Sequence, residues 1–181
     1  DFGIPCKIEE EHNHNQINLF SKKPSSTIVG GAQYRVYKFP VESPNHGPRT
    51  LVADPENTIA SPFGWHDTDG ISGPEYTITR GNNVHAYNDI GSTNSSLGDE
   101  PDGGALLSFD FTSDLTLSPS TNTPSAENLN TNTTNLFYAS NMMHDIWYAY
   151  GFDEAAGNFQ ENNYGNRGIG GDYVRAEAQD G

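Results

Sequence analysis

The sequence has only one cysteine, Cys6, so no disulfide can form within the chain and cysteine usage does not fix a redox compartment. Basic residues are also few, with 9 Lys and Arg against 24 Asp and Glu, which gives a formal net charge of -15. A surface of this charge repels a polyanion, which argues against nucleic acid as a partner. No apolar run approaches the roughly 18 residues of a membrane-spanning helix, so no membrane partner is expected.

In contrast to cysteine and the basic residues, small and polar residues are abundant. Hydrophobic residues make up 33% of the chain and glycines number 19, while Asn, Ser, Thr and Asp are plentiful. This composition is typical of short strands joined by many turns. Together with the patterns described below, it predicts an α+β fold, made mainly of short antiparallel β-strands with one long amphipathic helix near residues 135–150.

Four regions follow one another along the chain. Residues 1–30 have no sustained period and are predicted to form an extended arm. Residues 31–117 contain the strand-like segments and are predicted to form a β-rich lobe. Residues 118–134 contain two prolines and almost no apolar residue, which predicts a polar loop. Residues 135–181 combine the helix with a glycine-rich tail.

The strand predictions rest on alternation of apolar and polar residues. Residues 34–39 place Tyr34 and Val36 on one side and end at Pro40, and residues 49–55 predict a second short strand. Two β-branched and aromatic runs, residues 76–79 and 84–87, are joined by RGNN and predict a hairpin. Further strands are predicted where alternation recurs, at residues 107–111 and 172–178.

The helix prediction rests on apolar residues that recur at steps of three and four. These residues are Leu136, Ala139, Met143, Ile146, Trp147 and Tyr150. They predict the packed stripe of an amphipathic helix, with Thr133 or Thr134 as N-cap and Gly151 as the stop.

Within this helix, His144 and Asp145 raise the question of a metal site. A zinc-protease helix presents two histidines at positions i and i+4, with a glutamate beside the first as general base. Here position 148 is tyrosine, position 145 is aspartate, and no H-E-x-x-H occurs in the 181 residues. We therefore predict that His144 and Asp145 form a capped or hydrogen-bonded polar pair at the edge of the helix stripe and do not bind a metal directly.

Two acidic, glycine-containing loops are candidate calcium sites. HDTDG (residues 66–70) offers Asp67 and Asp69, and GDEPDGG (residues 98–104) offers Asp99, Glu100 and Asp102. Alternating acids and glycines let a loop curl its oxygens around a hard cation. Neither loop has the bidentate glutamate of an EF-hand at the twelfth position, and ordinary Asp-Gly turns are the alternative.

Two N-x-S/T triplets offer glycosylation acceptors at Asn94 and Asn132. Both lie in polar surroundings that predict loops. Such triplets also arise by chance in a chain rich in Asn, Ser and Thr.

Five segments together resemble, in order, the N-terminal half of the fungalysin family of secreted, thermolysin-like zinc metallopeptidases. They are ASPFGWHDTDG (60–70), EYTITRGNNVHAYND (75–89), PDGGALLSFDF (101–111), TNLFYASNMMHDIWYAYGFDEAAGNFQENNYG (134–165) and GGDYVRAEAQDG (170–181). The resemblance covers roughly residues 32–181, and the block NMMHDIWYAYGFDEAAGNFQ is its most specific part.

The resemblance implies a secreted, extracellular endopeptidase that cuts polypeptide substrates and is made as a zymogen with its own inhibitory propeptide. Its zinc is held by the two histidines of H-E-x-x-H and a later glutamate. In the family that motif follows the QDG-type stretch that stands here at residues 179–181. The resemblance therefore implies that the zinc-binding, catalytic half lies downstream of this chain and that residues 1–30 lie at a propeptide junction. No catalytic residue and no zinc ligand are then expected in this chain, and the 181 residues alone are expected to be inactive.

A second hypothesis belongs to a different class of protein. The chain would be a non-catalytic, secreted β-rich binding module that keeps the family scaffold and binds calcium through its acidic loops. A coding sequence that continues into an H-E-x-x-H motif would favour the peptidase.

Overall fold

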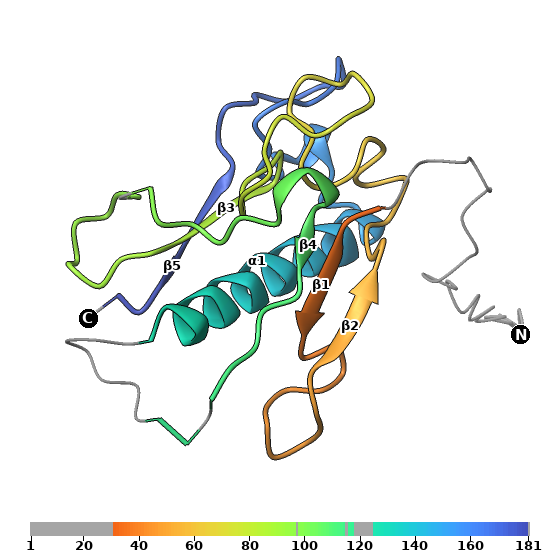
Figure 1. Ribbon diagram of the computed structural model, residues 1–181. Coiled ribbons are helices and arrows are strands. Elements are labelled where there is room, and N and C mark those ends of the chain that lie inside the picture. Colours follow the sequence, from red (N-terminus) through yellow and green to blue (C-terminus); the bar gives the residue numbers. More distant parts are fainter. Residues whose placement is uncertain (1–30, 97, 115, 118–124, 181) are drawn as a thin grey trace, which may run out of the picture.

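One long helix packs against two small sheets in the computed structural model, which describes residues 31–96, 98–114, 116–117 and 125–180 (Figure 1). The α+β class predicted from the sequence is confirmed. The elements, in chain order, are β1 (Gln33–Val36), β2 (Thr50–Ala53), β3 (Val84–Asn88), the 3-10 helix η1 (Gly104–Leu106), β4 (Ser108–Phe109), α1 (Ala126–Ala149), the 3-10 helix η2 (Glu154–Ala156) and β5 (Val174–Ala178). The predicted arm at residues 1–30 and the first part of the predicted polar loop, residues 118–124, lie outside the described residues.

The first sheet has the order β2-β1-β4. In β1, Tyr34 and Val36 are buried while the residues between them are half-buried, as the alternation predicted. Strand β2 pairs with β1 antiparallel, with Tyr34 opposite Val52, and β4 pairs with β1 parallel, with Tyr34 opposite Phe109. The pairing brings the rings of Tyr34 and Phe109 into a stack with centroids 5.2 Å apart.

The second sheet consists of β3 and β5, which run parallel. All five residues of β3 are buried, and the connection from β3 to β5 includes α1, which packs against both strands. A helical crossover of this kind is what parallel neighbours require. The prediction of mainly antiparallel strands is therefore wrong, because alternation identifies the buried face of a strand but says nothing about the direction of its neighbour.

The predicted hairpin at residues 76–87 is only partly formed. Ala86 N donates to Thr79 O at 2.8 Å and Gly81 N donates to Val84 O at 3.0 Å, so the chain does reverse here. Residues 76–79 make no strand, however, and Arg80 and His85 form an isolated antiparallel bridge. The hydrogen bond from Ala86 uses one edge of β3, and the other edge pairs with β5, which arrives from far along the chain.

Helix α1 begins at Ala126, well before residue 135. Its N-cap is Ser125, whose side chain accepts a hydrogen bond from Asn128 N at 3.2 Å. The predicted caps Thr133 and Thr134 are buried inside the helix, and residues 126–134 of the predicted polar loop are helical. The predicted end is confirmed, because Gly151 follows the helix with a φ of +92°, a conformation that favours glycine.

The buried face of α1 differs from the predicted stripe. Its buried residues are Thr131, Thr133, Thr134, Phe137, Tyr138, Asn141 and Asp145. Met143 and Trp147, which the pattern placed in the core, are 40% and 51% exposed. The helix therefore buries a largely polar face and leaves an apolar one open.

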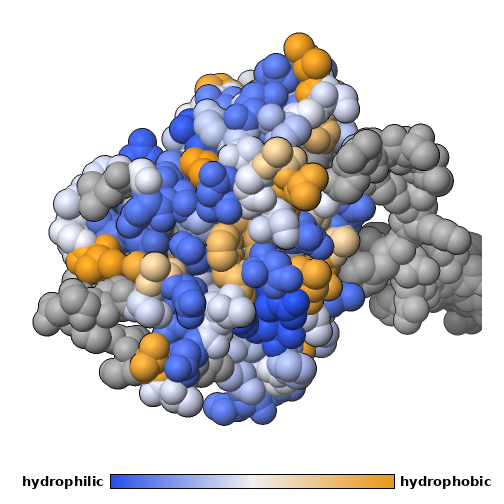
Figure 2. All heavy atoms as spheres, viewed as in Figure 1, coloured by the Kyte–Doolittle hydropathy of each residue, from blue (hydrophilic) through white to orange (hydrophobic). Residues whose placement is uncertain are grey.

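The core lies between α1 and the two sheets. It is formed by Tyr34, Val36, Trp65, Val84, Ala86, Phe109, Phe137, Tyr138 and Ala176. The face of the molecule drawn in Figure 2 is largely hydrophilic, with separate hydrophobic patches. Within the described part of the chain, no helix has the length and apolar character needed to cross a bilayer.

Candidate functional site

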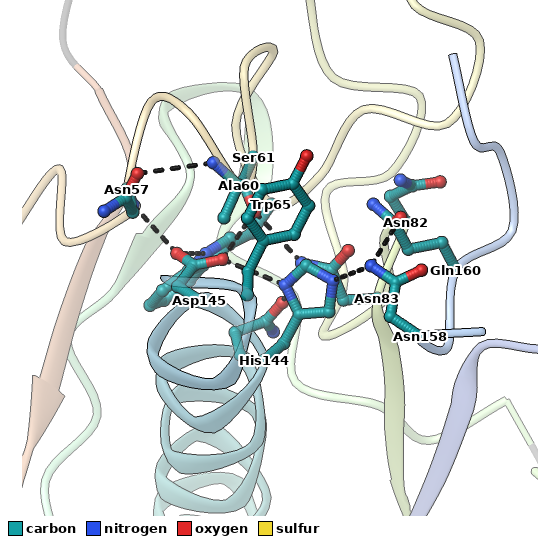
Figure 3. A network of polar contacts seen from close by, with 12 residues as sticks. Asn57, Ala60, Ser61, Trp65, Asn82, Asn83, His144, Asp145, Asn158 and Gln160 are labelled. Atoms are coloured by element: carbon teal, nitrogen blue, oxygen red, sulfur yellow. Dashed lines mark hydrogen bonds and ion pairs between the residues drawn. The ribbon is translucent and has the colours of Figure 1, made fainter. Parts of the chain in front are cut away.

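The carboxylate of Asp145 is the centre of a buried polar network (Figure 3). Its Oδ1 accepts from the hydroxyl of Ser61 at 2.8 Å, and its Oδ2 accepts from Trp65 Nε1 at 3.0 Å and from the backbone N–H of Asn57 at 2.8 Å. The ring of His144 supplies a fourth contact, from Nδ1 to Oδ1 at 3.0 Å. These bonds offset the cost of burying a carboxylate. They also fasten α1 to the loop that carries Asn57, Ser61 and Trp65.

The network continues from the loop into strand and helix. Asn83 Nδ2 donates to Ser61 Oγ and to Asn141 Oδ1, each at 3.1 Å. Asn141 Nδ2 then donates to Phe137 O, one turn earlier in α1, at 2.9 Å. All four residues are buried, so these hydrogen bonds replace the hydration that their polar atoms lose on folding, although Asn83 Oδ1 is buried without a partner. Side-chain amides therefore replace apolar packing along this face of α1.

His144 joins the network to the segment after α1. With Nδ1–H donating to Asp145, Nε2 is the acceptor for Asn158 Nδ2 at 3.3 Å. The same Nδ2 donates to Gln160 Oε1 at 2.8 Å. The prediction that His144 and Asp145 form a hydrogen-bonded polar pair is supported by these contacts.

An apolar cavity of about 520 Å³ opens beside His144. Its polar lining comes from Asn83, Ser140 and His144, and its apolar lining includes Met143, Trp147, Phe152, Phe159 and Val174. A serine, a histidine and an aspartate close together suggest nucleophilic catalysis, yet no hydrogen bond among the described residues joins Ser140 to His144. The nitrogen that would act as base contacts Asn158 instead. The cavity is therefore suited to the packing of apolar side chains, and His144 supplies a hydrogen-bonding group at its margin.

His66 lies in the core, away from this cavity. Its ring stacks on Phe109 at 5.2 Å and on Phe137 at 5.0 Å. Nδ1–H donates to Arg80 O at 3.0 Å, and Nε2 accepts from the hydroxyl of Tyr34 at 2.8 Å. Burial lowers the pKa of His66 to about 4, against the smaller opposing effect of its backbone hydrogen bonds. This histidine is therefore neutral and structural.

In the second acidic loop, residues 98–104, the side chain of Glu100 bonds to a histidine and a serine and does not join the other two acids of the loop. Its Oε1 accepts from His85 Nε2 at 2.7 Å and from the hydroxyl of Ser96. Burial raises the pKa of Glu100, but these hydrogen bonds and its own backbone N–H outweigh burial and lower the pKa overall. Burial lowers the pKa of His85 despite the neighbouring carboxylate. Hydrogen bonds therefore affect the pKa values of His85 and Glu100 more than the direct charge interaction between the two residues does.

The other two acids of that loop lie apart. Asp102 Oδ1 accepts from Gly104 N at 2.8 Å, as in an ordinary Asp-Gly turn, and Asp99 is exposed. Among the described residues, Asp99, Glu100 and Asp102 do not form a cluster with metal-ligand spacing.

The first acidic loop does bring acids together. Single carboxylate oxygens of Asp67, Asp69 and Glu75 all lie within 4.8 Å of one another. Asp67 and Asp69 are calcium candidates predicted from the sequence, whereas Glu75 is not. It lies outside the HDTDG segment and reaches back because Glu75 N donates to His66 O at 3.1 Å, which closes the loop.

The two glycosylation acceptors lie in different settings. Asn94 is exposed in a loop with a φ of +53°, whereas Asn132 is exposed on α1 and not in a loop. Thr134, the hydroxyl residue of the second triplet, is fully buried. Asn94 therefore has the better access, and glycosylation of either residue stays a prediction.

The described residues do not suit a catalytic zinc ion. Such a site takes three protein ligands, commonly including histidine nitrogens, and keeps one position open. The only ligand cluster in the described part of the chain contains carboxylates alone. His66, His85 and His144 are each held by other partners. That no residue of this chain is a zinc ligand stays a prediction.

Several residues of the Asp145 network could not be found from sequence. Asn57, Ser61, Asn158 and Gln160 are common polar residues with no periodic signal, and they meet only through the fold. Trp65, next to an acidic loop, was the one available hint, because a buried indole N–H needs an acceptor.

Comparison with known proteins places these features in context. Residues 33–181 match the sequence profile of a family described as fungalysin metallopeptidase (M36). A probable extracellular metalloproteinase 5 of Trichophyton verrucosum is 40% identical over 153 residues, which cover 84% of this chain and 23% of that protein. Extracellular metalloproteinase 5 of Trichophyton tonsurans is 36% identical over 173 residues, or 96% and 26%.

A third relative extends the match over nearly the whole chain. Extracellular metalloproteinase mep of Aspergillus flavus is 40% identical over 187 residues, which cover 99% of this chain and 28% of that protein. The chain thus spans about a quarter of the length of the curated relatives it matches.

Proposed function

Since this chain belongs to the fungalysin metallopeptidase family, we propose that it is the N-terminal part of a secreted zinc endopeptidase that hydrolyses peptide bonds in polypeptide substrates. The observation that carries the proposal is the match over residues 33–181 to relatives named extracellular metalloproteinases. Those relatives are about four times as long as the matched segment, as the covered shares of 23% to 28% imply. The zinc-binding half would then lie downstream, and a propeptide would keep the enzyme inactive until it is removed.

The absence of a zinc site among the described residues is consistent with that division. Because the residues present do not fit the ion, no step of peptide hydrolysis is assigned to them. Their contribution would be structural: the Asp145 network holds α1 and the loop at residues 57–65 in one arrangement.

The cavity beside His144 supports a packing role for this part of the chain. Met143, Trp147 and Phe159 expose 40%, 51% and 49% of their surface around it. Apolar side chains clustered at an open cavity indicate a surface that is covered by protein. We assign the downstream half as its occupant, because the relatives have most of their length outside the matched segment.

Two measurements test the proposed function. The coding sequence is expected to continue into an H-E-x-x-H motif and a later glutamate. The purified 181-residue chain is expected to leave casein uncut with added zinc. Chelator-sensitive casein cleavage by the 181 residues alone would overturn the proposal. A coding sequence without the motif would also overturn it and favour the non-catalytic binding module.

The packing role has its own test in the full-length protein. Trp147→Asp places a charge on the apolar surface and is expected to lower the yield of active, secreted enzyme. Leu106→Asp is the matched control, since Leu106 is 69% exposed and does not line the cavity. Equal yields for the two variants would contradict the assignment of the downstream half to this surface.

A further inference from the structure

The loop at residues 66–75 gathers three carboxylates at one point. Oxygens of Asp67, Asp69 and Glu75 lie within 4.8 Å of one another, a spacing that a single ion can bridge. Three like charges at this separation repel one another, and among the described residues none of the three takes part in an ion pair. The fold therefore holds together a group of acids that lacks a compensating positive charge in the described part of the chain.

Asp67 supplies a second, independent observation. The residue is only 1% exposed, and its Oδ1 accepts from Gly70 N and from the hydroxyl of Tyr164, both at 2.9 Å. Its Oδ2 is buried and has no hydrogen-bond partner. Buried carboxylate oxygens normally have partners, because an unpaired one loses its hydration without replacement. Asp67 therefore has an oxygen without a protein partner on a carboxylate that lies beside two others, so this oxygen is available as a metal ligand.

The contacts of the other two acids leave them able to bind an ion. Asp69 Oδ1 accepts from Ile71 N at 2.7 Å. Glu75 Oε2 accepts from Thr68 N at 2.5 Å and from Thr68 Oγ1 at 3.3 Å. A carboxylate has two oxygens with about four lone-pair sites, so these bonds orient each group without using its full capacity. Both side chains are exposed, which gives an ion and its waters a route to the buried Asp67.

From these contacts we propose that Asp67, Asp69 and Glu75 bind one Ca²⁺ ion. All three ligands are hard oxygens, which calcium prefers, while zinc would favour nitrogen or sulfur. The exposed side of the cluster can supply the waters that complete the six to eight oxygens of calcium, whose flexible geometry tolerates such a loop better than the strict octahedron of magnesium does. The site requires nothing from the downstream half and is independent of the proposed function.

Binding would connect two distant segments of the chain. Tyr164 donates to Asp67, and Asn162 Nδ2 donates to Thr68 O at 3.0 Å, so the segment after α1 already rests on this loop. An ion on the other oxygen of Asp67 would fix the loop from its second side. Because the ion binds the folded chain, it raises the unfolding temperature by mass action.

The test uses the 181-residue chain, calcium titration by calorimetry, and luminescence of Tb³⁺ as a calcium probe. Tyr164 lies against the site and can transfer excitation to bound Tb³⁺. Wild-type chain is expected to bind one Ca²⁺, to sensitise Tb³⁺ in a way that excess Ca²⁺ reverses, and to gain thermal stability with Ca²⁺. Glu75→Gln and Asp69→Asn are expected to weaken binding by about tenfold or more each, since each removes a charged ligand.

Asp67→Asn keeps an oxygen for Gly70 N and Tyr164 and is expected to weaken binding most. If that buried variant fails to fold, the exposed Asp69 and Glu75 variants still decide the question. Asp99→Asn is the matched control, an exposed acid in the other loop, and is expected to bind as wild type. No saturable binding at millimolar Ca²⁺, or equal binding by Glu75→Gln and wild type, would overturn the proposal.

Discussion

The indole N–H of Trp65 donates to the carboxylate of Asp145 over 3.0 Å, and both side chains are buried. The two residues are 80 positions apart in sequence. Their bond therefore exists only when the loop and the second half of α1 have come together. Stability of the whole packing arrangement should depend on it.

Replacing Asp145 with alanine is expected to lower the free energy of unfolding by at least about 3 kcal/mol. The change leaves the donors of Trp65, Ser61 and Asn57 without their acceptor, and each buried donor left unpaired costs roughly 1–3 kcal/mol. Urea unfolding followed by tryptophan fluorescence measures the loss. Asp99→Ala, at an exposed position, should stay within about 0.5 kcal/mol of wild type. Similar losses in both variants would contradict the network's role.

His66 should make stability depend on pH. Its pKa is about 4 in the folded chain against 6.5 for an unperturbed histidine, so between these values the unfolded chain binds more protons. Stability therefore rises with pH over this window. The contribution, about 3 kcal/mol from 1.36 kcal/mol per pKa unit, is complete above the unfolded value and is lost as pH falls towards 4.

Proton NMR of the histidine rings checks this expectation directly. The ring signal that disappears in His66→Gln should titrate near pH 4 in the wild-type chain. Titration of that signal at pH 6 or above would show that the ring is not buried between Phe109 and Phe137 as described.

Gly81 should tolerate no side chain. A Cβ at this position would lie 1.6 Å from Trp65 O and 2.6 Å from Trp65 C, both backbone atoms. Gly81→Ala is therefore expected to cost more than about 2 kcal/mol, because the strand entry and the Trp65 backbone must separate. Gly91→Ala is the matched control: its Cβ would meet only Thr93 Cγ2, at 3.5 Å, and should change stability by less than about 1 kcal/mol. Thermal unfolding of the two variants makes the comparison.

Two aromatic residues of α1 should respond differently to truncation. Phe137 is fully buried, so Phe137→Ala is expected to cost about 3–5 kcal/mol through lost packing and a cavity. Trp147 is 51% exposed, so Trp147→Ala in the 181-residue chain should cost less than about 1.5 kcal/mol. A larger loss at Trp147 in urea unfolding would mean that the helix buries the face predicted from sequence.

Sequence predicted the strands well where one face is apolar. Tyr34 and Val36 alternate with half-buried residues in β1, and β5 forms within the segment at residues 172–178. Strand direction could not be predicted, since β3 and β5 are neighbours only through the path of α1. Local patterns carry no information about a partner so far along the chain.

The buried face of α1 was missed because polar residues form it. Thr131 Oγ1 donates to Thr112 O at 2.8 Å, and Thr133 Oγ1 donates to Asn88 Oδ1 at 3.0 Å. Threonine and asparagine are weak helix formers, so the sequence of residues 126–134 predicts a loop. Hydrogen bonds to distant parts of the chain, which the sequence does not reveal, stabilise the helix there. Of the apolar stripe that periodicity found, Ala139, Met143 and Trp147 line the open cavity, whereas Leu136 packs against the core.

Two of the three ligands of the candidate calcium site could be predicted from the sequence. Asp67 and Asp69 belong to a compact acidic segment, which composition identifies. Glu75 joins them through a backbone closure that no spacing rule describes, and the loop at residues 98–104 has the same composition without the same geometry.

The parallel pairing of β3 with β5 also delays the completion of this sheet during synthesis. All five residues of β3 are buried, yet its partner strand ends at Ala178. At about 5–20 residues per second, a ribosome needs roughly 5–20 seconds to make the chain between Asn88 and Ala178. Through that interval the nascent β3 has an unpaired edge and depends on chaperones or on early contact with α1 to avoid pairing with another chain.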